Sequence, residues 1–144
     1  MLIGQYNHTI DPKKRLSLPS KWRAELGDKV IVTAGLDKSL FVYTINEWNV
    51  ISEKLSNLPL TSVEGRGFTR YMLGNAYEVD IDSAGRILIP ENLKSMAGLE
   101  TQVVLAGMYK RIEIWSEDAW QKVMQSTAAD VDSLTLKLGE LGVL

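Results

Sequence analysis

The sequence repeats one nine-residue pattern, first as Asp11-Pro12-Lys13-Lys14-Arg15-Leu16-Ser17-Leu18-Pro19 and again, 71 residues later, as Asp82-Ser83-Ala84-Gly85-Arg86-Ile87-Leu88-Ile89-Pro90. In both versions an aspartate opens a run of turn formers, because aspartate accepts hydrogen bonds from nearby backbone amides, proline fixes φ and glycine frees it. An arginine and a short alternating stretch follow. The stretch ends at a proline, which cannot donate to a β-ladder but suits the start of a helix. The pattern predicts a turn, a short strand and a helix in each half of the chain.

The likeness between the two halves extends beyond these nine residues. With the same offset of 71, the further matching pairs are Tyr6 with Tyr77, Ile10 with Ile81, and Gly27 with Gly98. One inserted residue raises the offset to 72, and the matching pairs are then Val32 with Val104, Ala34 with Ala106, Lys38 with Lys110, and Trp48 with Trp120. Internal similarity at a fixed spacing indicates a duplicated structural unit. The chain therefore contains two copies of one module.

Each copy is expected to contain four strands and two helices. Strands are expected at 3–10, 15–19, 29–34 and 39–43 in the first copy, and at 76–81, 86–90, 102–106 and 111–115 in the second. Short helices are expected at 20–26 and 91–97, each stopped by a glycine, and a closing helix follows in each copy after Thr44 or Ser116. The predicted organisation is a first repeat with its closing helix (1–50), linker helices (51–73), a second repeat with its closing helix (74–125) and a helical tail (126–144).

A module of roughly 45 residues is too small to bury a sufficient core by itself. We therefore expect the two copies to pack together, or to interleave their strands, as one pseudo-symmetric barrel with flanking helices. The predicted fold class is α+β. The tail carries apolar residues at helical spacing, which is typical of core or subunit packing.

The composition disfavours an enzyme. The 144-residue chain has no cysteine and a single histidine, His8, so disulfides and thiolate metal sites are excluded and histidine chemistry lacks partners. No dinucleotide or phosphate-loop motif occurs. The apolar runs are too short to cross a membrane. We expect no catalytic residue, no metal or other cofactor, no small-molecule substrate and no membrane association.

The charge is unevenly distributed along the chain. The net charge is −2, which by itself argues mildly against a nucleic-acid partner, because phosphate contacts need lysine and arginine. Residues 1–25 nevertheless carry a net charge of +3, whereas residues 111–144 carry −3. One face can therefore meet phosphate despite the acidic total.

Arg15 and Arg86 are the strongest candidates for a functional role. An arginine that follows a turn projects a planar fork of donors from a rigid strand, and this fork suits phosphate oxygens or the major-groove edge of guanine. In the first copy Lys13 and Lys14 stand beside it and add nonspecific attraction to phosphate. We expect these four residues to contact DNA.

The two aspartates of the pattern, Asp11 and Asp82, are expected to structure the loops by bridging to the arginines that follow them. A bridge of this kind is compatible with a functional arginine, because one guanidinium can serve both purposes. The remaining candidate cations are secondary contacts to DNA or to a neighbouring subunit: Lys21, Arg23, Arg66 and Arg70.

The second loop, with Glu113-Ile114-Trp115 and the following Trp120, resembles the MraZ family, whose repeats are similar to the AbrB-type swapped-hairpin DNA-binding module. The likeness runs from Met1 to about Met124. It implies a bacterial transcriptional regulator of the cytoplasm and nucleoid, which represses the division and cell-wall gene cluster by binding short direct repeats in double-stranded promoter DNA. It also implies a ring-like homo-oligomer.

One residue departs from this family pattern. Lys14 stands where the second copy has Gly85, so the first turn must form without a glycine's positive φ or under strain. The extra cation at this position favours phosphate binding.

The competing interpretation, supported by the acidic C-terminal third, is an oligomeric interaction or scaffold protein that does not bind DNA.

Overall fold

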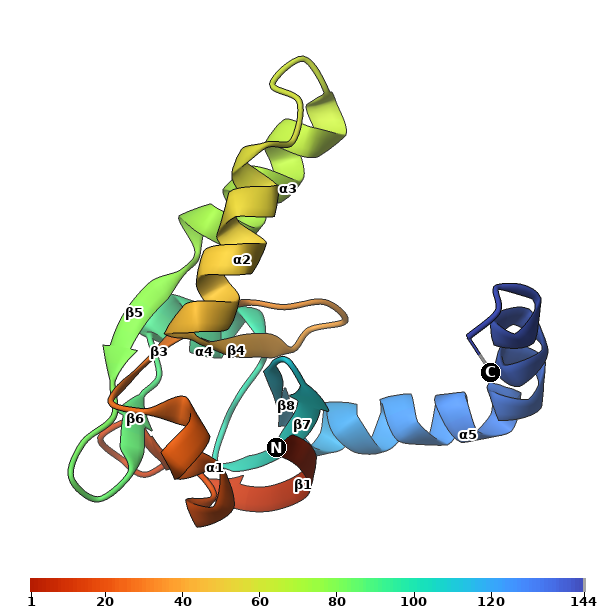
Figure 1. Cartoon of the computed structure of the whole chain (residues 1–144). Coiled ribbons are helices and arrows are strands. Elements are labelled where there is room, and N and C mark those ends of the chain that lie inside the picture. The colour runs from red at the N-terminus through yellow and green to blue at the C-terminus, as the bar shows by residue number, and fades with distance from the viewer. Residues whose placement is uncertain (144) are drawn as a thin grey trace.

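The computed structural model describes residues 1–143, which form eight strands and five helices (Figure 1). The elements of the first half are β1 (Leu2–Thr9), β2 (Arg15–Ser17), α1 (Ser20–Leu26), β3 (Lys29–Ala34), β4 (Leu40–Thr44), α2 (Ile45–Ser56) and α3 (Val63–Gly74). Those of the second half are β5 (Tyr77–Asp80), β6 (Arg86–Leu88), α4 (Glu91–Met96), β7 (Gln102–Tyr109), β8 (Ile112–Ser116) and α5 (Glu117–Glu140). The mixed α and β content agrees with the predicted class.

The two copies exchange strands. The main sheet is antiparallel with the order β1-β7-β8-β4-β3-β5, and β2 pairs with β6 in a separate two-stranded ribbon. Replacing each strand by its counterpart in the other copy only reverses this order, so the topology has a pseudo-two-fold axis between β4 and β8. The first strand of each copy pairs with the third strand of the other copy. Of the two arrangements that the sequence left open, packing of whole copies or interleaving of their strands, the structure has the interleaved one.

The ladders correct the sequence alignment for one pair of strands. Val32 pairs with Val42 in the first copy, and Leu105 pairs with Ile114 in the second. Because Val42 and Ile114 are counterparts at offset 72, the counterpart of Val32 is Leu105 at offset 73. The predicted match with Val104 is wrong by one residue. The second copy gains two residues before β7 and lacks one in the turn before β8.

The main core lies between the sheet, the ribbon and the two short helices. Apolar side chains at matched positions of the two copies are withdrawn from water, which is the main favourable contribution to folding. The matched buried pairs include Leu16 with Ile87, Leu18 with Ile89, Trp22 with Leu93, Leu26 with Ala97, Val32 with Leu105, Leu40 with Ile112, and Val42 with Ile114. The core is therefore shared by the two copies and belongs to neither alone.

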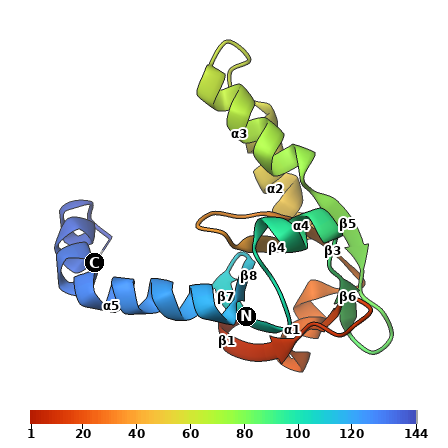
Figure 2. The same ribbon diagram turned by 180° about the vertical axis from the view of Figure 1, so that it is seen from behind.

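The helices outside the sheet break the symmetry. In the first copy α2 and α3 form a hairpin, and its Leu55 and Met72 pack against Phe41 and Tyr43 of the sheet. In the second copy α5 is one helix of 24 residues with no buried residue. The helical tail predicted at 126–144 continues this helix as far as Glu140, and residue 144 lies outside the described residues. Seen from behind in Figure 2, the hairpin and α5 project from the sheet in different directions. No helix within residues 1–143 is long and apolar enough to span a membrane.

Candidate nucleic-acid interface

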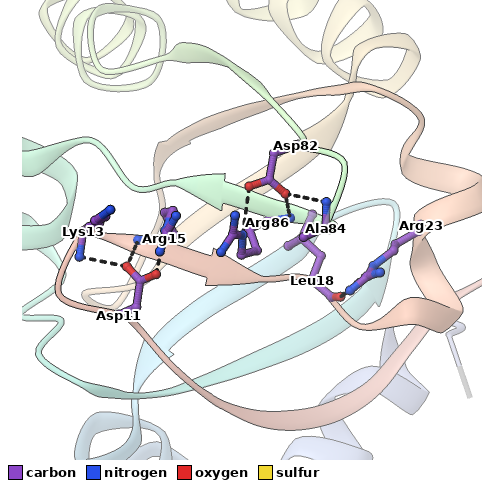
Figure 3. Close-up of polar contacts among 8 residues, drawn as sticks. All are labelled: Asp11, Lys13, Arg15, Leu18, Arg23, Asp82, Ala84 and Arg86. Carbon is purple, nitrogen blue, oxygen red and sulfur yellow. Dashed lines mark hydrogen bonds and ion pairs between the residues drawn. The ribbon is translucent and has the colours of Figure 1, made fainter.

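The β2–β6 ribbon brings the two copies of the nine-residue pattern together. Leu16 pairs with Ile87, and both side chains are buried in the core. Because side chains alternate along a strand, the neighbouring residues point outward. Arg15 and Arg86 therefore lie on the same outer face of the ribbon, each contributed by a different copy (Figure 3).

The first loop is held closed by Asp11. Its Oδ1 accepts hydrogen bonds from the backbone N–H of Lys13 at 2.9 Å and of Arg15 at 2.8 Å, and its Oδ2 accepts from Arg15 Nε at 2.6 Å. The backbone N–H of Arg15 contributes most to lowering the pKa of the Asp11 carboxyl, and the Arg15 guanidinium lowers this pKa further. The aspartate thus fixes both the turn and the direction of the arginine.

The second loop repeats this geometry. Asp82 Oδ1 accepts from the backbone N–H of Ala84 at 3.0 Å and of Arg86 at 2.8 Å, and Oδ2 accepts from Arg86 Nε at 2.9 Å. The pKa of the Asp82 carboxyl is lowered in the same way, first by the backbone N–H of Arg86. Within residues 1–143, neither Arg15 nor Arg86 uses its Nη1 or Nη2 in a hydrogen bond or ion pair with the protein. In this part of the chain, each guanidinium is therefore held by the protein through Nε alone.

The position before each arginine differs between the loops. Gly85 has a φ of 77°, and Lys14 adopts a similar φ of 65°, a region that a residue with a Cβ rarely enters. The sequence left open whether the first turn forms without a positive φ or under strain, and the φ of Lys14 shows that it forms under strain. Lys14 forms an ion pair with Glu91 of the other copy, and the hydrogen bond and charge of Lys14 lower the pKa of the Glu91 carboxyl. Part of the positive charge of the first loop is thereby neutralised.

The secondary candidates lie in different places. Lys21 is exposed on α1, whereas Arg23 on the same helix is partly buried and donates to the backbone carbonyl of Leu18. Arg66 donates to the carbonyl of Leu60 near the tip of the helical hairpin, and Arg70 lies on the exposed side of α3. In Figure 1 the hairpin tip and the ribbon are at opposite ends of the molecule. Arg66 and Arg70 therefore do not share a surface with the loops.

Sequence reasoning missed the contacts that cross between the copies. Neither the ion pair of Lys14 with Glu91 nor the packing of Arg23 on Gly85 joins residues that are close in sequence, so local spacing carries no signal for them. The outward positions of Ser17 and Leu88, which lie opposite the two arginines, follow from strand alternation and could have been found. Residues 1–143 contain no group of three or more side chains able to hold a metal ion.

A family model matches the chain twice. It is described as that of the MraZ protein, antitoxin-like, and it covers residues 1–71 and 72–135, so its two matches begin 71 residues apart, at the offset found within the sequence. The chain belongs to the MraZ family. Each MraZ repeat contains one of the two loops, and the ribbon pairs the strand that follows one loop with the strand that follows the other.

Relatives along the whole chain bear similar names. A protein of Caldicellulosiruptor saccharolyticus is 49% identical over 143 residues, which are 99% of this chain and 100% of the relative. Proteins of Alkaliphilus metalliredigens and Clostridium acetobutylicum are 48% and 44% identical over the same shares of the two chains. All three are named transcriptional regulator MraZ.

Proposed function

We propose that this chain is a sequence-specific DNA-binding transcriptional regulator and that the outer face of the β2–β6 ribbon contacts the DNA. The observation that carries the proposal is the placement of Arg15 and Arg86, one from each copy, on one outward face, each oriented by its own aspartate. The names of the relatives agree with a regulatory role.

The size of the ribbon suits a DNA groove. The major groove of B-DNA is about 12 Å wide and admits a two-stranded β-ribbon. Arg15 pairs with Leu88, which is two residues from Arg86 on the same strand. The two arginines are therefore diagonal neighbours, and the Cα atoms of such neighbours are about 7–8 Å apart. A guanidinium held through Nε can offer its two terminal nitrogens to the O6 and N7 atoms of guanine or to a phosphate. Lys13, which is exposed at the edge of the ribbon, supplies a phosphate contact.

The acidic part of the chain does not oppose this contact. Figures 1 and 2 place the ribbon on the side of the molecule away from α5, which carries much of the C-terminal negative charge. We propose further that the DNA target is a set of short direct repeats in the promoter of the division and cell-wall genes, that the protein represses these genes, and that it acts in the cytoplasm at the nucleoid. The strand exchange supports an AbrB-type swapped-hairpin barrel.

The unequal helices support a homo-oligomer. The helix α5 is the counterpart of α2, but the described residues contain no counterpart of α3 to pack beside it. Its apolar stripe is consequently exposed: Val131, Leu134, Leu138 and Leu141. We propose that a second copy covers this stripe with its helical hairpin, whose Arg66 and Arg70 complement the acidic α5. Such contacts, continued in a ring, would let several ribbons engage successive repeats, and weak contacts would then add through effective concentration.

The competing function is an interaction or scaffold protein without DNA binding, which the net charge of −2 favours. Fluorescence anisotropy separates the two functions by measuring the affinity for promoter DNA and for a shuffled duplex. The salt concentration is varied between roughly 50 and 200 mM, the range over which phosphate contacts weaken strongly. The proposal predicts tighter binding to promoter DNA and an affinity that falls as salt rises. Failure to bind either duplex at low salt would refute it and leave the scaffold function.

A further inference from the structure

Arg23 of the first copy lies across the second loop. Its Nε and Nη2 donate to the carbonyl of Leu18 at 3.2 Å and 3.1 Å, and the N–H of Leu18 donates to the carbonyl of Gly85 at 2.9 Å. Arg23, Leu18 and Gly85 therefore form one connected set that joins helix α1 to the turn of the other copy. Figure 3 shows Arg23 at the end of the ribbon where the loop of Asp82 and Ala84 turns.

The guanidinium covers the backbone of Gly85. A methyl group added at Gly85 would stand only 2.2 Å from both Cζ and Nε of Arg23, and Gly85 is buried although it lies in a loop. Its counterpart Lys14 has the same type of φ but is exposed. Gly85 thus suits the second loop in two ways: it adopts the positive φ, and without a Cβ it leaves the space that the Arg23 guanidinium occupies.

The first loop is braced by a different contact. The counterpart of Arg23 is Lys94, which makes no hydrogen bond or ion pair with its side chain within residues 1–143, and the brace is instead the ion pair of Lys14 with Glu91. Both partners of that pair are about half exposed, with side-chain exposures of 47% and 60%. Each loop also accepts one backbone hydrogen bond from the opposite copy, from the N–H of Leu18 to the carbonyl of Gly85 and from the N–H of Ile89 to the carbonyl of Lys14. The two loops therefore have the same internal turn and the same backbone bond but different side-chain supports.

We propose that Arg23 is a positioning residue for the second loop: by packing on Gly85 and binding Leu18, it fixes the turn that directs Arg86. The inference rests on the proposed DNA-binding function, because its consequence is the affinity contributed by Arg86. Arg23 acts through Arg86 and does not itself bind phosphate. Removing it therefore weakens DNA binding only while Arg86 is present.

The test is a double-mutant cycle measured as promoter-DNA affinity by anisotropy. Arg23→Ala should weaken binding several-fold, by no more than Arg86→Ala does, and should add nothing in the Arg86→Ala background. Arg23→Lys should behave like Arg23→Ala, because a lysine keeps the charge but loses the planar fork. Lys94→Ala, the matched control in the other copy, should leave the affinity within about twofold, since a surface change away from such contacts has a small effect.

Three results would overturn the inference: equal weakening by Arg23→Ala with and without Arg86, full recovery in Arg23→Lys, or a salt dependence reduced by about one phosphate contact when Arg23→Ala is added to Arg86→Ala. If the wild type binds no DNA, that result refutes the proposed function only, and the contact of Arg23 with Gly85 can still be tested by urea unfolding. Gly85→Ala should destabilise the wild type more than it destabilises Arg23→Ala, in which the guanidinium no longer fills the space. Equal destabilisation in urea would show that the brace does not exist.

Discussion

Gly107 of β7 lies directly opposite Gly4 of β1, where the first strand of one copy pairs with the third strand of the other. A methyl group at Gly107 would stand 2.6 Å from the backbone N of Ile3 and from the backbone C of Leu2. These atoms belong to the paired strand and cannot rotate away as a side chain can. The counterpart of Gly107 at offset 73 is Ala34, where alanine is accommodated because the pairing of β5 with β3 ends at Val32.

Gly107→Ala should therefore destabilise the fold by the cost of overpacking, about 1–3 kcal/mol. Urea unfolding at a fixed protein concentration should show a lower midpoint with an unchanged slope. Gly67→Ala is the matched control, because no atom lies within 4 Å of the added methyl group and alanine favours a helix such as α3. This control should gain about 0.5–1 kcal/mol. A Gly107→Ala midpoint equal to that of the wild type would refute the close approach of the β1 backbone to Gly107.

Three further outcomes are expected. The carboxyls of Asp11 and Asp82 have pKa values lowered from 3.8, so their stabilising contribution is present above that pH and is lost as the pH falls through the folded-state values. Unfolding followed by circular dichroism should therefore show a stability that depends less on acid pH in the double asparagine variant than in the wild type. Leu16→Ala should cost about 2–5 kcal/mol in urea unfolding, because Leu16 is fully buried. Leu134→Glu with Leu138→Glu should lower the mass measured by sedimentation, and an unchanged mass would contradict the proposed contact through α5.

Local signals predicted the elements of the fold well. The helix α1 at Ser20–Leu26 matches its prediction to the residue, because Pro19 precedes it and Gly27, with a φ of 74°, ends it. The duplication itself followed from repeated residues at a fixed offset. The small size of each module predicted that the two copies pack together or interleave their strands, but that argument could not choose between the two or determine which strands pair.

Two features of the fold required the structure. The sequence alignment matched Val32 with Val104 because the two residues are identical. The ladders show instead that the second copy has two more residues before β7 and one fewer in the turn before β8, so the correct match along β7 is shifted by one residue. The continuity of α5 through residue 126 was also missed. Helical spacing indicates that a segment is helical, but it does not show whether that segment continues the preceding helix.

The sequence predicted some contacts of the candidate site and missed others. The bridges from each aspartate to the arginine four residues later are local, and the sequence predicted them. The supports of the loops come from the opposite copy and depend on which strands are exchanged. Arg23 was consequently predicted only as a secondary surface cation, and Glu91 was not predicted at all.

The most direct test of the central claim is the affinity for promoter DNA of a variant that lacks both ribbon arginines. Each arginine contact is worth about 1–3 kcal/mol, so Arg15→Ala combined with Arg86→Ala should weaken binding by at least about 30-fold. The control variant Lys54→Ala with Lys122→Ala removes the same charge from α2 and α5 and should bind within about threefold of the wild type, as expected for positions away from the contact. Wild-type affinity in the double arginine variant would contradict the claim that the ribbon is the DNA-binding surface.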